Sequence, residues 1–455
     1  MIDILIVNDN KFREQFSTEL LFGYLKKNLT VRVVSKSIFR TAIQLLKPQV
    51  VVVPRVQSDF HDIFDFKERY KFQLFFIPVE HSGGNESGIL SFMKSYIKKD
   101  ALDQNHSKKL KLNVNKVFVP GKFYKDILLK HDLFNENQII ITGTPSSDLW
   151  FKDINLIFRK YKDTKQRTIG IATSFKSFMF GTQFESIQLG IQGISSYKSN
   201  LINNGDKKNQ IDISKQEKDF FFLWYEMYQF MIINKIISDN KNLNFSIRPH
   251  PMENIKNSRY YERVTKNLSV DRNLILNEWI SNQKMILSFG STLLYDSYFS
   301  GTPCYSLRKF MPNHITDMLD DYLKPVYSNF PFQPENFDQL YEIINSNEIK
   351  DDQYFTKYSE TKIKETSLPA FNFPRKEKAY KIIGDEIKNN LILKKETFLN
   401  KILLHFHSFI IFVKQIKISN FSLKYKKHTQ DKNYNPLKIF QNYQLRKYIK
   451  IILKQ

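Results

Sequence analysis

The first 150 residues alternate between short β-type runs and helical patterns. The runs are rich in Val, Ile and Phe, and helix-like stretches such as Phe12–Lys27 and Phe123–His131 separate several of them. Such alternation predicts a parallel sheet with helices on both faces. The predicted strands are Ile2–Val7, Leu29–Val34, Gln49–Val53, Phe72–Val79, Lys116–Val119 and Gln138–Thr142.

The same pattern restarts after a charged connector at residues 151–167. A strand at Thr168–Thr173 opens it, and a long apolar-periodic helix follows at Phe220–Ser238. We therefore expect an α/β chain of two Rossmann-type, doubly wound domains facing a cleft, at residues 1–160 and 161–390, with ligands beyond the carboxyl ends of the strands. Further strands are predicted at Asn244–Arg248, Lys284–Phe289 and Cys304–Leu307.

Composition narrows the kind of protein. The 455 residues carry a net charge of +23, which predicts an anionic partner surface such as phosphate, nucleic acid or acidic lipid. Cys304 is the only cysteine, which excludes a disulfide framework and a multi-cysteine zinc site and fits a reducing compartment. The N-terminus reads as a strand rather than a signal peptide, and no uncharged apolar stretch reaches about 18 residues. These features predict a cytoplasmic protein.

Residues 391–455 differ from the rest of the chain. They hold 14 Lys and Arg against 2 Asp and Glu, and a mostly apolar run at Ile402–Val413 lies between Lys401 and Lys414. The run is too short to span a bilayer but suits a helix lying on an anionic inner-membrane surface. We expect this segment to be a basic, helical, membrane-associating tail. The alternative is a basic face on a helix that packs against the body.

The stretch Arg248-Pro249-His250-Pro251 follows a predicted strand. Pro251 disfavours a helical conformation at His250, and Pro249 has a fixed φ, so the imidazole leaves the strand end in a restricted direction. An imidazole beside a guanidinium suits a phosphate. The alternative is a solvated strand end that the prolines stiffen.

A second candidate lies one βα unit downstream. Gly290, Ser291 and Thr292 link a strand to a predicted helix at Leu293–Phe299. Backbone N–H groups and hydroxyls at a helix N-terminus bind phosphate, although any serine or threonine cap gives the same pattern. Two such strand ends in one sheet predict a phosphate site.

These motifs carry a resemblance to a known family. The sequences IRPHP and SFGSTLLYDSYFSGTPCYSL resemble the donor half of the two-domain (GT-B) transferases that build bacterial surface polysaccharides. These include Kdo- and sialic-acid-type transferases that use CMP-sugars, CDP-glycerol polyol-phosphate transferases, and proteins called surface carbohydrate biosynthesis proteins. Further similar segments lie at Phe72–Glu80, Lys116–Leu128, Ile139–Trp150 and Ala172–Phe175, so the likeness spans about residues 70–310.

The resemblance implies roles for several residues. His250 would contact the donor phosphate or the cytidine ribose, and Ser291 and Thr292 would bind the phosphate. Arg248 would be a supporting group or a counter-charge. The remaining donor-side residues would be Thr173 and Ser174, closing over the leaving group, and Gly290, permitting close backbone approach.

The catalytic base is predicted near the end of the strand at residues 72–79. Glu80 could accept the proton of the acceptor hydroxyl, and His81 competes for that role because its ordinary pKa lies near working pH. The alternative is that Glu80 caps the next helix. For Gly143–Pro145 with Asp148, a turn and cap are expected rather than catalysis.

No divalent-metal motif, P-loop or dinucleotide fingerprint occurs in the sequence. The leading hypothesis is therefore a metal-independent, membrane-associated glycosyltransferase of capsule or lipopolysaccharide synthesis. It would transfer a CMP-activated acidic sugar such as Kdo to a glycan or glycolipid, and it would need no cofactor besides this nucleotide-sugar substrate. One alternative is transfer from CDP-glycerol, and another is a nucleic-acid-binding protein, which the concentration of charge in the tail disfavours. A sugar-nucleotide epimerase has the same architecture but should lack a basic tail.

Overall fold

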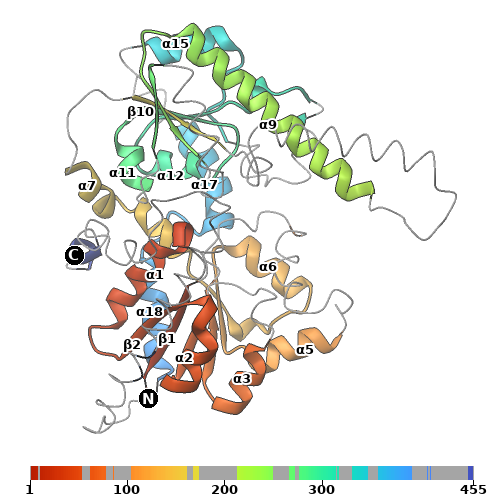
Figure 1. Ribbon diagram of the computed structural model, residues 1–455, viewed down its shortest axis with the longest axis vertical. Helices are drawn as coiled ribbons and strands as arrows, with labels where there is room; N and C mark the ends of the chain where they lie inside the picture. The colour runs from red at the N-terminus through yellow and green to blue at the C-terminus, as the bar shows by residue number, and fades with distance from the viewer. Residues whose placement is uncertain are drawn as a thin grey trace, which may run out of the picture. The chain divides into compact units, whose positions relative to one another are not determined.

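The computed structural model divides the chain into two compact units. The first comprises Met1–Ile157 and Ile363–Gln455, and the second comprises Phe158–Lys362 (Figure 1). The structure describes residues 2–8, 11–53, 62–77, 86, 104–160, 168–173, 213–249, 266–271, 276–313, 315–316, 330–346, 357–391, 407, 410 and 449–453.

The first unit is built on a parallel sheet whose described strands lie in the order β2-β1-β3-β4-β5-β6. The predicted parallel α/β pattern is confirmed, with strand ends shifted by at most a few residues. The strands are β1 Ile4–Asn8, β2 Val31–Ser35, β3 Val50–Val53, β4 Gln73–Phe76, β5 Lys116–Val119 and β6 Ile139–Ile141.

Helices cover both faces of this sheet because alternate residues of each buried strand point to opposite sides. One face packs on α2, α3 and α6 through residues such as Leu5 and Val51, and the other packs on α1 and α18 through Ile4 and Val50. The helical elements are α1 Lys11–Leu25, η1 Lys36–Ile38, α2 Phe39–Leu46, α3 Ile63–Tyr70, α5 Gln104–Asn113, α6 Lys122–Lys130, η3 Glu136–Gln138, η4 Pro145–Trp150 and α18 Ala379–Asn389. The chain passes between the units within α7 Lys152–Lys160 and within α17 Lys357–Phe371.

The helix α18 belongs to the first unit, although it lies far along the chain. It runs beside α1 (Figure 1), where the Tyr24 and Tyr380 ring centroids are 5.4 Å apart and the Tyr24 hydroxyl donates to Asp385 at 2.8 Å. The expected second domain at 161–390 is corrected by this packing, because the chain returns to the first unit from Ile363.

Only small parts of the predicted tail lie within the described residues. Ile449 and Ile452 are buried, and the Lys27 ammonium donates to the Leu453 carbonyl oxygen at 3.0 Å. This last described turn packs against α1. The apolar run at 402–413 lies outside the described residues except for His407 and Ile410.

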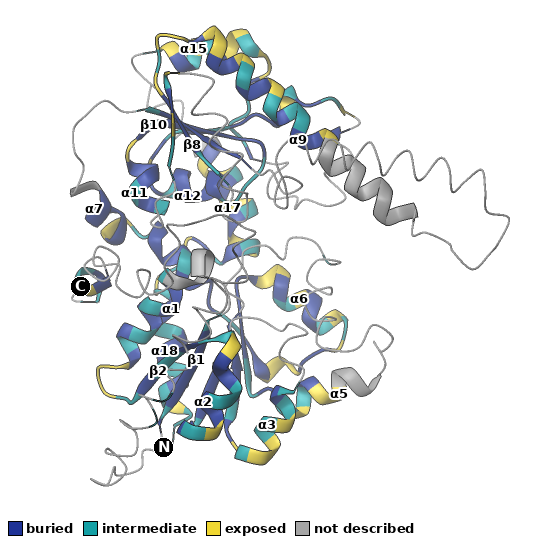
Figure 2. Cartoon of the chain, viewed as in Figure 1, coloured by how far each residue is buried: buried dark blue, intermediate teal, exposed yellow. Residues whose placement is uncertain are grey.

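The second unit has its own parallel sheet, with described strands in the order β11-β10-β7-β8-β9. Helices α9 and α15 pack on one face through Ile233, Ile237 and Leu340 (Figure 1), and Figure 2 shows the sheet buried beneath its helices. The elements are β7 Thr168–Ala172, α9 Ile213–Asp239, β8 Phe245–Arg248, β9 Leu268–Val270, α11 Leu276–Ser281, β10 Gln283–Ser288, α12 Leu293–Phe299, β11 Cys304–Ser306, η6 Arg308–Phe310 and α15 Phe337–Asn345.

Candidate functional site

The central strands of the second sheet bring several predicted residues to one edge. Ala172 of β7 pairs with Arg248 of β8 on one side and with Ser288 of β10 on the other. The Thr173 N–H donates to the Arg248 carbonyl oxygen at 3.2 Å. Thr173, Arg248 and the loop Gly290–Thr292 therefore leave three adjacent strands at their carboxyl ends, where open α/β sheets bind ligands.

The loop Gly290–Thr292 has the backbone geometry of a tight strand-to-helix connection. Gly290 has φ 132°, a conformation that glycine adopts more readily than residues with a Cβ atom. The Tyr225 hydroxyl fixes the start of the loop by donating to the Phe289 carbonyl oxygen at 3.3 Å. Among the described residues, no acceptor receives the N–H group of Ser291 or Thr292. The loop thus has two N–H groups whose hydrogen bonds a phosphate could accept.

Ser291 also has a structural role. Its Oγ accepts from the Leu293 N–H at 3.3 Å, and its carbonyl oxygen accepts from the Leu294 N–H at 3.0 Å. Helix α12 is only seven residues long, so its dipole adds less than the sequence pattern suggested. The Thr292 side chain forms no capping hydrogen bond. The Thr292 hydroxyl, unlike the Ser291 hydroxyl, therefore makes no hydrogen bond that starts the helix.

Arg248 lies in a largely buried setting at the end of β8. Its side chain is 16% exposed, its Nη1 is 3.7 Å from Asp271 Oδ1, and its guanidinium carbon is 5.6 Å from the Trp279 ring centroid. Burial lowers the pKa of Arg248, while the negative charges of Asp271 and Asp296 raise it. The guanidinium thus lies near the Asp271 carboxylate, and the Asp296 charge also acts on it.

Four predicted site residues lie outside the described residues, namely Glu80, His81, Ser174 and His250. Their described neighbours in the chain end at Ile77, Thr173 and Pro249. Glu86, which follows Glu80 and His81 in the sequence, accepts hydrogen bonds from the Lys130 ammonium at 2.9 Å and pairs with His131 at the end of α6. These contacts lower the pKa of Glu86.

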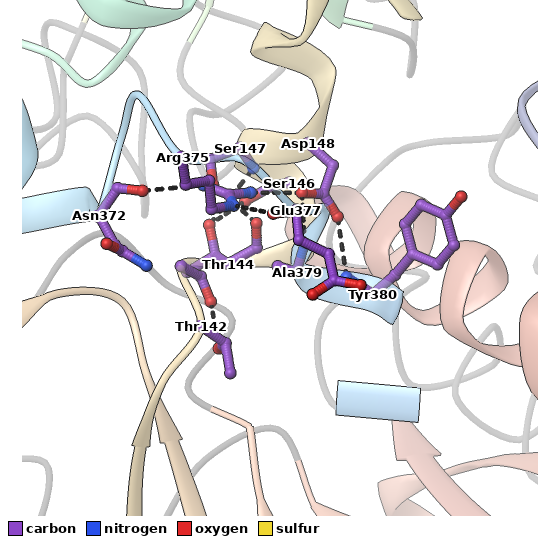
Figure 3. Close-up of polar contacts among 11 residues, drawn as sticks. Thr142, Thr144, Ser146, Ser147, Asp148, Asn372, Arg375, Glu377, Ala379 and Tyr380 are labelled. Atoms are coloured by element: carbon purple, nitrogen blue, oxygen red, sulfur yellow. Dashed lines mark hydrogen bonds and ion pairs between the residues drawn. The ribbon is translucent and has the colours of Figure 1, made fainter. Parts of the chain in front are cut away.

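The segment Thr142–Asp148 has a structural function, in keeping with the turn and cap expected for it. Thr144 Oγ1 accepts from the Ser147 N–H at 3.3 Å and begins η4. The fully buried Asp148 carboxylate accepts from the N–H groups of Ala379 at 2.7 Å and Tyr380 at 2.9 Å, and it forms an ion pair with Arg375 (Figure 3). Asp148 therefore caps α18 from a position more than 200 residues away in the sequence.

Two glycines of the first unit leave room for the residues around Pro369 and Arg375. A Cβ atom on Gly121 would overlap with the Pro369 carbonyl oxygen, and one on Gly143, whose φ is 74°, would overlap with the Arg375 guanidinium. The motifs around Gly121 and Gly143, which carry part of the family resemblance, thus pack against residues 369–380.

Sequence reasoning missed the groups that surround Arg248. Asp271 follows the three-residue strand β9, whose shortness hid it, and the Asp271 N–H donates to the Ile247 carbonyl oxygen at 2.9 Å. Asp296 lies in the first turn of α12, and the Trp279 Nε1–H donates to Ser246 Oγ at 2.9 Å. The one available signal was a carboxylate directly after the short segment Leu268–Val270, where no strand was predicted.

Two kinds of feature are absent from the described residues. Within those ranges, His, Cys, Asp and Glu side chains form no group of three or more that could hold a metal ion. No helix there is long and apolar enough to cross a membrane.

Comparison with known proteins identifies the fold. No protein-family model and no curated protein matches the chain. Among solved structures, a variant of the wall teichoic acid polymerase TagF matches with a TM-score of 0.51 and 11% identity, over 85% of this chain and 88% of that chain. The same variant soaked with CDPG gives 0.50 and 10% over the same shares. The S. aureus MnaA complex with UDP gives 0.48 and 12%, over 87% and 99%. With the two parallel sheets, the TagF likeness shows a GT-B-like α/β fold.

Proposed function

We propose that this chain is a transferase of surface-glycan synthesis that binds a cytidine-nucleotide-activated donor at the carboxyl edge of the second sheet. The observation that carries the proposal is the meeting of Thr173, Arg248 and the Gly290–Thr292 loop on three adjacent strands. The N–H groups of Ser291 and Thr292 would hold the donor phosphate, with the Thr292 hydroxyl beside them.

The reaction would follow from that phosphate site. The loop donors stabilise the negative charge that develops on the departing nucleotide phosphate, and His250 would donate to the same phosphate. Glu80 or His81 would accept the proton of the acceptor hydroxyl as its oxygen attacks the donor. Dependence on these side chains rather than on a metal ion is part of the proposal.

The leading donor is a CMP-activated acidic sugar such as Kdo. Attack of the acceptor oxygen on the anomeric carbon breaks the bond from that carbon to the phosphate oxygen and releases CMP. The acceptor would be a glycan or glycolipid, and the basic tail would hold the protein at the cytoplasmic face of an anionic membrane.

A second candidate donor is CDP-glycerol, favoured by the fold likeness to TagF soaked with CDPG. Here the acceptor oxygen would attack the phosphorus next to the glycerol and again release CMP. Both reactions share one leaving group, so one phosphate site would serve either. Isotope-labelled acceptor products from CMP-Kdo and from CDP-glycerol would separate the two.

Thermal unfolding with CMP, CDP, UDP and GDP tests the donor class. At a concentration about 100-fold above Kd, a ligand stabilises the folded state by about 2.7 kcal/mol, or about 5–10 °C in Tm for a domain of roughly 200 residues. We expect the cytidine nucleotides alone to give this shift. Equal shifts with all four nucleotides, or none with any, would overturn the proposal.

The variant Thr292→Val locates the site. Because the Thr292 side chain makes no capping bond, this variant should keep the ligand-free Tm of the wild type and lose most of the CMP shift. Thr316→Val is the control, since the Thr316 hydroxyl donates to the Asn313 carbonyl oxygen in a partly exposed position outside this loop. The control should keep the CMP shift.

A further inference from the structure

Two carboxylates from different elements act on Arg248. Asp271 follows β9, with its Oδ1 3.7 Å from Arg248 Nη1, and Asp296 belongs to α12 and attracts the same guanidinium. The Trp279 ring of α11 lies 5.6 Å from the guanidinium carbon. One side chain of β8 thus interacts with β9, α11 and α12.

We infer that Arg248 is a positioning residue, which holds the first turn of α12 and the end of β9 against β8, rather than a ligand of the donor phosphate. The inference deepens the proposed function, on which its nucleotide-binding part rests. Of the two roles that the resemblance implies for Arg248, a supporting group or a counter-charge, the inference selects the first and assigns it the shaping of the Gly290–Thr292 loop.

The charge balance favours this assignment. The charges of two carboxylates act on one guanidinium, so the three groups together carry a net charge of −1 when all are ionised. A phosphate would compete with Asp271 and Asp296 for a cation that is only 16% exposed. Loss of one partner of such a pair leaves the other charge where the surroundings screen it poorly.

The connection from Arg248 to the loop is short. The Asp296 N–H donates to the Thr292 carbonyl oxygen at 3.0 Å, so the residue that Arg248 attracts is hydrogen-bonded to the loop itself. Without Arg248, Asp271 and Asp296 would lose a shared counter-charge, with Asp296 only 8% exposed. Hydration of the Asp296 carboxylate would then pull the first turn of α12 away from β8 and loosen the N–H groups of Ser291 and Thr292.

Replacement of Asp271 distinguishes a positioning role of Arg248 from direct phosphate contact, because the two roles predict opposite changes in CMP affinity. If Arg248 bound phosphate, Asp271→Asn would remove a competitor and tighten CMP binding. If Arg248 positions the loop, Asp271→Asn weakens CMP binding by about 2- to 30-fold, the range of such couplings. Asp338→Asn is the matched control, because it removes the same charge from an exposed site in the first turn of α15.

Hydrogen exchange without ligand tests the inference separately from the proposed function. We expect Asp271→Asn and Arg248→Gln to speed amide exchange at residues 293–297, and Asp338→Asn to leave it unchanged. Arg248→Lys keeps a positive charge near the carboxylates and should give intermediate rates, which also covers the case in which Arg248→Gln does not fold.

The outcomes are distinct. Faster exchange at 293–297 together with weaker CMP binding in Asp271→Asn supports the inference, and tighter CMP binding overturns it. Unchanged exchange at 293–297 in both Asp271→Asn and Arg248→Lys also overturns it, whatever CMP does. If wild-type protein binds neither CMP nor CDP, the proposed function fails, and the exchange rates still decide whether Arg248 holds α12.

Discussion

Replacing Asp148 with alanine tests how the returning chain is held in the first unit. The Asp148 carboxylate is fully buried, accepts the first two N–H groups of α18 and pairs with Arg375, whose side chain is 5% exposed. Asp148→Ala would leave a buried cation and two amide donors without their acceptor. Loss of one partner of a buried ion pair costs about 3–5 kcal/mol, more than the roughly 0.5–2 kcal/mol of a helix cap alone.

Native-state hydrogen exchange of α18 measures this cost locally. Since each 1.4 kcal/mol is a factor of ten, the opening of α18 should become about 10²- to 4 × 10³-fold more frequent in Asp148→Ala. Asp153→Ala is the control, because Asp153 is 45% exposed and pairs with Lys378 on the same returning segment. A surface pair contributes under about 1 kcal/mol, so exchange in the control should rise by less than about fivefold.

A second comparison separates the buried charge from the cap. The double variant Asp148→Leu with Arg375→Met removes both charges and should recover much of the loss, because apolar replacement of a buried pair is often neutral. Equal exchange of α18 in Asp148→Ala and Asp153→Ala would refute the reasoning.

Three further predictions follow from described contacts. Gly121→Ala should destabilise the first unit by about 1–3 kcal/mol in urea unfolding, because its Cβ meets the Pro369 backbone; wild-type stability would contradict this. Trp279→Ala should lower the Tm of the second unit by an amount equivalent to about 3–5 kcal/mol, and a loss below 1 kcal/mol would be inconsistent with its burial. Burial raises the pKa of Asp385, but the hydrogen bonds from Lys388 and Tyr24 lower it by more than burial raises it. The net pKa of Asp385 therefore lies below its ordinary value. Its contribution to stability is complete above the unfolded pKa near 3.9 and is lost as pH falls through the lower folded pKa, so Asp385→Asn should flatten the acid-unfolding profile there; an unchanged profile would argue against it.

The sheets could be predicted because their signals are local. Val50–Val53 is an apolar run of strand length, Gln283–Ser288 has the apolar centre Met285–Leu287, and the intervening helices show their own period. The strand β9 was missed because Leu268–Val270 is three residues long and holds an exposed serine. Short edge strands carry too few residues for an alternating pattern.

The return of the chain to the first unit from Ile363 could not be predicted from local patterns. Lys378, which precedes α18, forms no side-chain capping bond, and the cap comes instead from Asp148. A contact between residues 148 and 379 leaves no signal in either segment alone. The sequence therefore placed residues up to 390 in the second domain.

The candidate site was predictable in part. Thr173, Arg248 and Ser291 share an edge because each follows a parallel strand, and carboxyl ends of parallel strands meet. The environment of Arg248 depends on which strand lies next to β8, and the order β7-β8-β9 is a property of the whole sheet. Asp271 therefore became visible as a partner only in the folded chain.

Hydrogen exchange of the wild-type chain with and without CMP tests the central claim most directly. We predict that CMP slows exchange at residues 171–173, 247–248 and 289–296, and leaves the sheet of the first unit unchanged. Absence of protection at these positions with CMP and with CDP, or protection confined to other elements, would contradict a cytidine-nucleotide site at this edge.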